Sequence, residues 1–291
     1  MTSTASDLKK RILNRRLPFA RMLRRLKLLS YLNFHENISI NKRKIAIPLK
    51  AGVGVQHAWS TDKAMLNIYR RLLASSPGLF IDVGANIGQT LLKIRALDPQ
   101  RRYIGFEPNP ICVDYLVTLI TKNNFSNCDI VPVGLSDSNE VVRLFLNDDV
   151  DSAATLIEEF RPEKIPPTLT NYVSTFRLDD IAESLTIRNI AVIKIDVEGS
   201  ELEVLKGAMN LLKAERPVIV CEILPLYDEN SKTGAQRAPR QRELIELLHG
   251  MEYSMARIQH AHATLVAIKD IEVHSNLDLC DYVFSPKEKT F

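Results

Sequence analysis

The fold of this chain is decided by one stretch, Ile81-Asp82-Val83-Gly84-Ala85-Asn86-Ile87-Gly88. It ends the apolar run 79–83, which has the composition of a buried strand, and it leads into a helical pattern over 88–97. The two glycines let the backbone turn tightly and approach a ligand closely. Their GxxxG spacing differs from the GxGxxG that seats a pyrophosphate on a helix N-terminus, which argues against NAD or FAD. Asp82, just before the turn, suits a ligand that carries an ammonium group.

Strand and helix patterns alternate along the rest of the chain. We expect strands at 102–106, 128–133, 191–195 and 217–223, with helices at 111–122, near 200–212 and near 242–248. Ser200 and Glu203 form a capping-box pair at the start of one helix. An exposed strand at 141–146 precedes a polar loop at 147–171, and strands at 253–258 and 281–285 close the chain. These units predict an α/β, Rossmann-like doubly wound sheet, mostly parallel with an antiparallel C-terminal strand.

Acidic residues stand where several of these strands end. Glu107 ends the second strand, where a carboxylate can accept both hydroxyls of a ribose. Together with the first turn, it describes a nucleoside with a cationic amino-acid tail and no phosphate, which is S-adenosylmethionine (SAM). Asp196 and Glu198 end the fourth buried strand, where they could hold the ammonium, bind an acceptor, accept a proton or ligate a divalent metal, although nothing in the sequence requires a metal. Glu222 lies in an apolar strand and is expected to face the site or to pair with a Lys or Arg.

Several motifs resemble those of the FkbM family of SAM-dependent methyltransferases. The resemblance spans about residues 80–222, and its most specific part is the block Ile195-Asp196-Val197-Glu198-Gly199. The other matching motifs are Asp82-Val-Gly-Ala-Asn-Ile-Gly88, Phe106-Glu107-Pro108, Leu135-Ser136-Asp137, Leu178-Asp179-Asp180, and Glu201 with Val204-Leu205-Lys206-Gly207-Ala208. The resemblance implies a class I methyltransferase fold and, usually, O-methylation of a hydroxyl on a sugar or secondary metabolite.

The same resemblance implies roles for individual positions. Glu107 would hold the ribose, and Asp137 would lie near the adenine. Asp196 and Glu198 would face the transferred methyl group and the acceptor. The methionine end of the cofactor would be lined by Asp82, Gly84, Asn86 and Gly88.

Composition and charge restrict the remaining interpretations. The 291 residues are 45% apolar and 25% charged, as in an ordinary globular protein. No run of about 20 apolar residues predicts a transmembrane helix, and no apolar segment with a cleavage site predicts secretion. The four cysteines are widely separated, which favours a reduced, cytoplasmic setting.

The first 50 residues differ from the rest in charge. They hold 13 Lys and Arg against two acids, and we assign 1–50 to a basic, partly helical extension and 51–291 to the methyltransferase domain. Within residues 8–30, leucines at helical spacing alternate with arginines. Such a helix could rest peripherally on an anionic membrane at its inner face, or pack on its own domain or on a dimer mate. No nucleic-acid partner is expected, because the body lacks a basic surface interleaved with aromatic residues. The sequence indicates no oligomeric state.

The function predicted from the sequence is SAM-dependent O-methylation of a small-molecule or glycan acceptor, such as a sugar of a lipid-linked glycan. The base that takes the hydroxyl proton would be Asp196 or Glu198, and His57 is an outside candidate. Two alternatives stay open. One is a non-catalytic nucleotide-fold scaffold with a membrane-associating arm, and the other is a nicotinamide-dependent oxidoreductase, which the glycine spacing disfavours.

Overall fold

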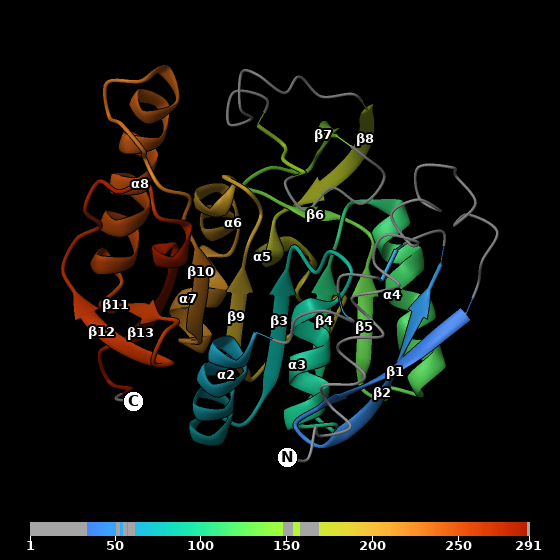
Figure 1. Ribbon diagram of the computed structural model, residues 1–291. Coiled ribbons are helices and arrows are strands. Elements are labelled where there is room, and N and C mark those ends of the chain that lie inside the picture. Colours follow the sequence, from blue (N-terminus) through green and yellow to red (C-terminus); the bar gives the residue numbers. More distant parts are fainter. Residues whose placement is uncertain are drawn as a thin grey trace, which may run out of the picture.

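Eight strands form one continuous sheet in a computed structural model that describes residues 34–50, 53–54, 57, 62–147, 154–157 and 169–289. The strand order is β12-β11-β13-β10-β9-β3-β4-β5 (Figure 1). The chain starts the parallel part at its middle and winds outward in both directions. The parallel strands are β3 (Leu79–Val83), β4 (Tyr103–Phe106), β5 (Cys128–Val131), β9 (Ile190–Ile195) and β10 (Val218–Glu222). This confirms the predicted doubly wound sheet.

The C-terminal end of the chain completes the sheet with antiparallel pairs. Strand β13 (Asp281–Pro286) lies between β10 and β11 (Tyr253–Gln259) and runs antiparallel to both. Strand β12 (Thr264–Ile268) pairs with β11 at the edge. The predicted antiparallel C-terminal strand is therefore confirmed, whereas β12 was not anticipated.

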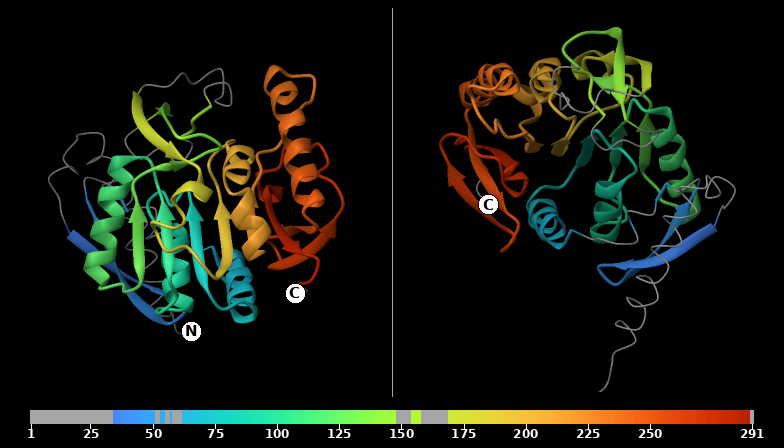
Figure 2. Two further views of the ribbon diagram at one scale, coloured as in Figure 1. Left: turned by 180° about the vertical axis from the view of Figure 1, so that it is seen from behind. Right: turned by 45° about the horizontal axis from the view of Figure 1, so that its top comes forward.

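Helices cover both faces of the sheet, because each central strand is buried on both sides. Alternate residues such as Phe80 and Val192 pack under α2 (Lys63–Ser75), α3 (Gln89–Leu97) and α4 (Pro110–Asn123). Their neighbours, such as Ile81 and Ile193, pack under the helices of the opposite face. Figure 2 shows the layers of helices on the two sides of the sheet. Those helices are α5 (Leu178–Ile181), α6 (Glu201–Gly207), α7 (Met209–Glu215) and α8 (Lys232–Gly250). Such continuous apolar strands are typical of parallel sheets.

A small second sheet stands above the carboxyl ends of the parallel strands (Figure 1). It consists of β6 (Gly134–Leu135), β8 (Leu169–Phe176) and β7 (Glu140–Leu146), in that order. Leu144, Leu146 and Val173 form its own apolar cluster. Strand β8 begins inside the segment that the sequence indicated as a loop.

Residues 34–49 form a hairpin that lies against α4. Strands β1 (Phe34–Ile40) and β2 (Arg43–Leu49) pair antiparallel around Asn41 and Lys42, which both have positive φ. The side chain of Asn123 in α4 bonds the Ala46 backbone on both sides, through Oδ1 at 2.8 Å and Nδ2 at 2.7 Å. The basic composition of residues 1–50 predicted a partly helical extension, and no strands were expected there. The basic segment 8–30 lies outside the described residues, so its helix and its membrane association stay predictions.

The predicted capping box of Ser200 and Glu203 is wrong. Ser200 makes no side-chain cap bond; the amides of Val197 and Gly199 are bound instead by Glu201 Oε1, at 3.4 and 2.9 Å. Glu203, the other member of the expected capping box, pairs with Arg240.

No helix in the described part of the chain has the length and apolar character that crossing a bilayer requires.

Candidate functional site

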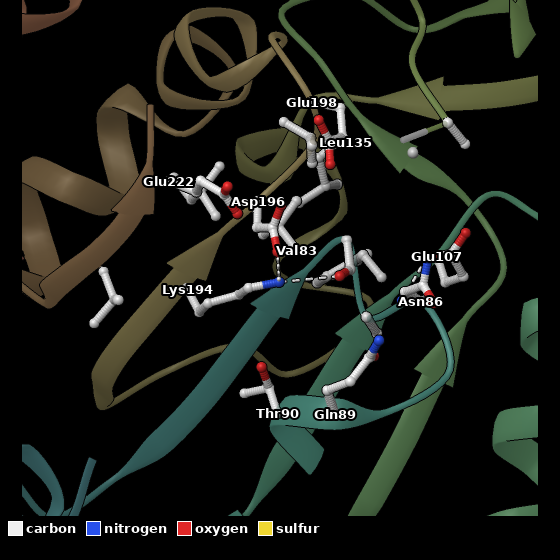
Figure 3. Close-up of a pocket in the computed structure, with 18 of the residues that line it drawn as sticks. Val83, Asn86, Gln89, Thr90, Glu107, Leu135, Lys194, Asp196, Glu198 and Glu222 are labelled. Atoms are coloured by element: carbon white, nitrogen blue, oxygen red, sulfur yellow. Dashed lines mark hydrogen bonds and ion pairs between the residues drawn. The ribbon is translucent and has the colours of Figure 1, made fainter. Parts of the chain in front are cut away.

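A cavity of about 340 Å³ opens where the parallel strands end. Its walls come from the ends of β3, β4, β9, β10 and β13, from the first turns of α2 and α3, and from the small sheet above (Figure 3). It lies at β3 and β9, the two strands between which the winding direction reverses. In doubly wound sheets this switch point is where ligands bind.

The turn after β3 is held by the protein's own backbone. Gly84 has a φ of 78°, and a Cβ there would lie 1.9 Å from the carbonyl oxygen of Asp196. Glycine is therefore needed because the β3 turn lies directly against the turn after β9. Gly88 has a φ of 92°, and a Cβ would lie 3.0 Å from Leu116, so this second glycine allows α3 to pack against α4. Gly84 lines the cavity, and Gly88 does not.

No amide in this turn is left for a phosphate. The N–H groups of Gly84 and Ala85 both donate to the Phe106 carbonyl at 3.0 Å, and that of Gly88 donates to the Ala85 carbonyl at 2.9 Å. The Asn86 amide donates to Glu107 Oε2, and the Ile87 amide to Asn86 Oδ1, each at 2.7 Å. Phosphate-binding turns work by aiming such amides at the ligand, so this turn does not have the chemistry of a dinucleotide site.

Glu107 presents a carboxylate to the cavity from the end of β4. It is only 6% exposed, and its Oε2 and Oε1 accept from the amides of Asn86 and Asn109 at 2.7 and 2.8 Å. Burial raises its pKa to about 7, although both amides oppose the rise. Each carboxylate oxygen has a second lone pair, so Glu107 can still accept hydroxyl hydrogens from a ligand. The predicted Glu107 and Asn86 thus meet at one wall.

Asp82 is not in that wall. Its side chain is fully buried, and Oδ2 accepts from the Tyr103 hydroxyl at 2.5 Å while Oδ1 lies 3.3 Å from Lys194 Nζ. Burial raises the Asp82 pKa, and the Lys194 ammonium opposes the rise. The ammonium beside Asp82 therefore belongs to the protein, and not to a ligand as the sequence analysis expected.

Lys194 was missed by the sequence analysis and proves central to the site. From the middle of the sheet its Nζ contacts Asp82, Asp196 Oδ2 at 3.1 Å and the Gly84 carbonyl at 3.0 Å. The two carboxylates raise its pKa against the effect of burial. The available signal was a lysine inside an otherwise apolar strand, because a buried charge requires partners.

Acidic side chains gather at the ends of β9, β10 and β13. Asp196, Glu198, Glu222 and Asp281 all line the cavity, which confirms that Glu222 faces the site. Glu222 hydrogen-bonds Asp196, and burial followed by the charges of Asp196, Asp281 and Glu198 raises its pKa to about 9. Burial and these neighbouring charges therefore favour the protonated form of Glu222, which can donate to Asp196. His260 Nε2 lies 2.7 Å from Asp281 Oδ2.

The turn after β9 brings Glu198 to the cavity with an uncommon backbone conformation. Glu198 and Gly199 have φ values of 55° and 111°, and the Glu198 carbonyl accepts from the Thr155 hydroxyl at 2.8 Å.

Among the described residues, no group of three or more His, Cys, Asp or Glu is placed to hold a metal ion.

Besides Asp82 and Gly88, two further residues singled out in the sequence, Asp137 and His57, do not line the cavity. Asp137 is exposed two residues after β6, while Gly134 and Leu135 of that strand line the cavity. His57 is buried against Tyr115, and its Nε2 lies 2.9 Å from the Ile87 carbonyl. Burial lowers its pKa to about 4, and His57 is not among the residues that line the cavity.

Comparison with known proteins agrees with this architecture. The family model of the FkbM methyltransferase domain matches residues 82–255. The chain belongs to this family. It is 29% identical over 160 residues to Methyltransferase sdnD of Sordaria araneosa, covering 46% of this chain and 61% of that protein. It is 30% identical over 158 residues to Hexuronic acid methyltransferase AglP of Haloferax volcanii, covering 53% of this chain and 60% of the relative.

The chain spans about three fifths of the length of these two relatives. Among solved structures, it is similar to Methyltransferase FkbM from Methylobacillus flagellatus, with a TM-score of 0.43 and 18% identity. That alignment covers 72% of this chain and 44% of the other.

Proposed function

We propose that this chain is a SAM-dependent methyltransferase that methylates a hydroxyl group on a sugar of a glycan or on a secondary metabolite. The observation that carries the proposal is the wall formed by the β3 turn and Glu107. A carboxylate faces the cavity there, beside a turn whose amides are all engaged within the protein. This combination suits a nucleoside without phosphate and does not suit NAD, FAD or ATP.

The residues that line the cavity fit such a cofactor. Glu107 would accept the ribose hydroxyls, and Gly134 with Leu135 would offer a flat apolar contact to the adenine. The bound cofactor supplies an electrophilic methyl group on a sulfonium. The acidic side chains at the ends of β9 and β10 suit that positive charge.

Asp196 is our proposed base for the acceptor hydroxyl. Its side chain is 34% exposed, and Lys194 holds one carboxylate oxygen at 3.1 Å. Protonated Glu222 would donate to the same carboxylate, so that the Asp196 side chain would be oriented from two sides. Orientation of this kind is the main contribution a protein makes to a direct displacement. Glu198, on the same turn, would contact the acceptor. The relative described as a hexuronic acid methyltransferase supports a sugar acceptor.

Titration calorimetry tests the cofactor. The full chain is expected to bind S-adenosylhomocysteine (SAH) and not NADH, and Glu107→Ala should abolish the binding. Glu183→Ala, which changes an exposed acid on the surface, is the matched control and should bind as the wild type does. Binding of NADH alone would refute the proposal in favour of an oxidoreductase, and binding of neither ligand at millimolar concentration would favour a non-catalytic scaffold.

The proposed membrane association of the basic segment 8–30 has its own test. Deletion of residues 1–30 should weaken sedimentation with vesicles that contain anionic phospholipid, because the segment contributes much of the positive charge of the N-terminal extension. Equal sedimentation of the two proteins would remove this part of the proposal.

A further inference from the structure

One end of the cavity has no role in the site described so far. It is formed by the first turns of α2 and α3, on the sheet face that these two helices cover. Gln89, Thr90 and Lys93 follow one face of α3, while Met65 and Tyr69 follow one face of α2. Both helices point their N-termini at the cavity, and a helix N-terminus favours a negative charge.

Lys93 is the cation at this end. No hydrogen bond or ion pair joins its ammonium to any residue in the part of the chain that the structure describes. Lys194, by contrast, has three oxygen partners within 3.3 Å. Burial lowers the pKa of Lys93, and the strongest opposing charge is that of Asp62. Asp62 caps α2 by accepting from the Met65 amide at 3.1 Å.

The cavity therefore has two ends of different character. The acids Asp196, Glu198 and Glu222 lie on the strands, and a carboxylate of a ligand would be repelled there. Lys93 lies on α3, where Asp62 supplies the strongest opposing charge without forming an ion pair with it in the described part of the chain. Lys93 is partly buried, and a partly buried cation without an ion-pair partner is unfavourable, so a ligand that brings an anion to it gains binding energy.

We propose that Lys93 binds the α-carboxylate at the methionine end of the cofactor. The inference rests on the proposed use of SAM, whose only anionic group is this carboxylate. The side-chain amide of Gln89, one turn earlier on the same face of α3, offers a further donor. A cofactor held by Lys93 at its carboxylate and by Glu107 at its ribose would leave the end of the cavity around Asp196 for the acceptor.

Two related ligands separate this role from general effects on the site. SAH carries the amino-acid end, and 5′-methylthioadenosine has the same nucleoside and thioether without it. By titration calorimetry on the full chain, Lys93→Met should weaken SAH binding about ten- to hundredfold and leave 5′-methylthioadenosine binding within about twofold of the wild-type value. Lys93→Arg, which keeps the charge, should retain most of the SAH affinity. Lys63→Met, at an exposed lysine of α2, should change neither ligand.

Equal weakening of both ligands in Lys93→Met, or no weakening of SAH, would overturn the assignment. If the variant does not fold, the wild type still decides: added salt should weaken SAH binding more than 5′-methylthioadenosine binding, and equal salt dependence would refute the role of Lys93. If neither nucleoside binds the wild type, the proposed function itself fails. If both bind and Lys93→Met treats them alike, the inference alone fails.

Discussion

Replacing Lys194 by methionine should destabilise the protein because it leaves Asp82 as a buried carboxylate without its cation. Asp82 is fully buried, and its other contact is the Tyr103 hydroxyl. The variant can avoid the buried charge by protonating Asp82. An aspartate in the unfolded chain has a pKa of about 3.9, so keeping Asp82 protonated at pH 7 costs about 4 kcal/mol of folding free energy. This cost lies within the range of about 3–5 kcal/mol for breaking a buried pair.

The size of this loss depends on pH with a definite sign. In the variant, the folded-state pKa of Asp82 is raised above its unfolded value, so stability is retained at low pH and lost as the pH rises. The loss of stability should shrink to about 1.5 kcal/mol at pH 5, because this pH is only about one unit above the pKa of an aspartate in the unfolded chain.

Urea unfolding at pH 5 and pH 7, followed by circular dichroism, measures both values. The double variant Asp82→Asn/Lys194→Met removes both charges and should recover most of the stability. Lys213→Met, at an exposed lysine of α7, is the control and should change stability by less than about 0.5 kcal/mol. A loss at pH 7 below about 1 kcal/mol, or a double variant no more stable than Lys194→Met, would refute the reasoning.

Three further predictions concern the cavity wall. SAH affinity should rise roughly tenfold from pH 6 to pH 8, because the Glu107 pKa is about 7 and the ionised form accepts the ribose hydroxyls. Calorimetry at both pH values should show this rise, and the Glu107→Gln variant should lack it. Gly84→Ala should destabilise the protein by at least about 2 kcal/mol in urea unfolding, because its Cβ would collide with Asp196; Gly250→Ala, where nothing lies within 4 Å, should not. Turnover should fall above about pH 9, because Glu222 then loses the proton that it shares with Asp196. The Glu222→Gln variant should not show this fall in the pH profile of turnover. A fall that persists in the variant would show that another group titrates.

Much of the fold could be predicted because the parallel strands are continuous apolar runs between turn signals. The carboxyl end of each strand then locates the site, which is why Glu107, Asp196, Glu198 and Glu222 come together as expected. The hairpin was missed because Arg43 and Lys44 sit beside its turn and resemble the basic stretch before it. Helix α8 begins ten residues before its predicted start. Gly234 and Pro239 have low helix propensity and so did not indicate a helix there, but the tertiary structure tolerates both.

The part that could not be predicted concerns pairing across strands. The partner of Asp82 is Lys194, 112 positions later in the chain, and only the register of β3 against β9 makes them neighbours. The sequence shows an acid before a glycine turn in either case, and it cannot show whether the opposing cation is a ligand or a side chain. Lys93 is similar, since a lysine in a helical pattern is ordinarily taken for a solvent-exposed residue.

The small sheet offers a practical route to new acceptors. It is built from one continuous stretch of chain between β5 and α5, and in the described part of residues 136–177 only Leu144, Ala154 and Leu156 line the cavity. The ribose wall, the buried ion pair and the proposed base all lie outside that stretch, in the main sheet and its turns. We therefore expect that this stretch can be exchanged without disturbing the proposed cofactor wall. Grafting the corresponding stretch from a relative with another acceptor, with joins at Leu135 and Leu178, should change the acceptor selectivity of the protein.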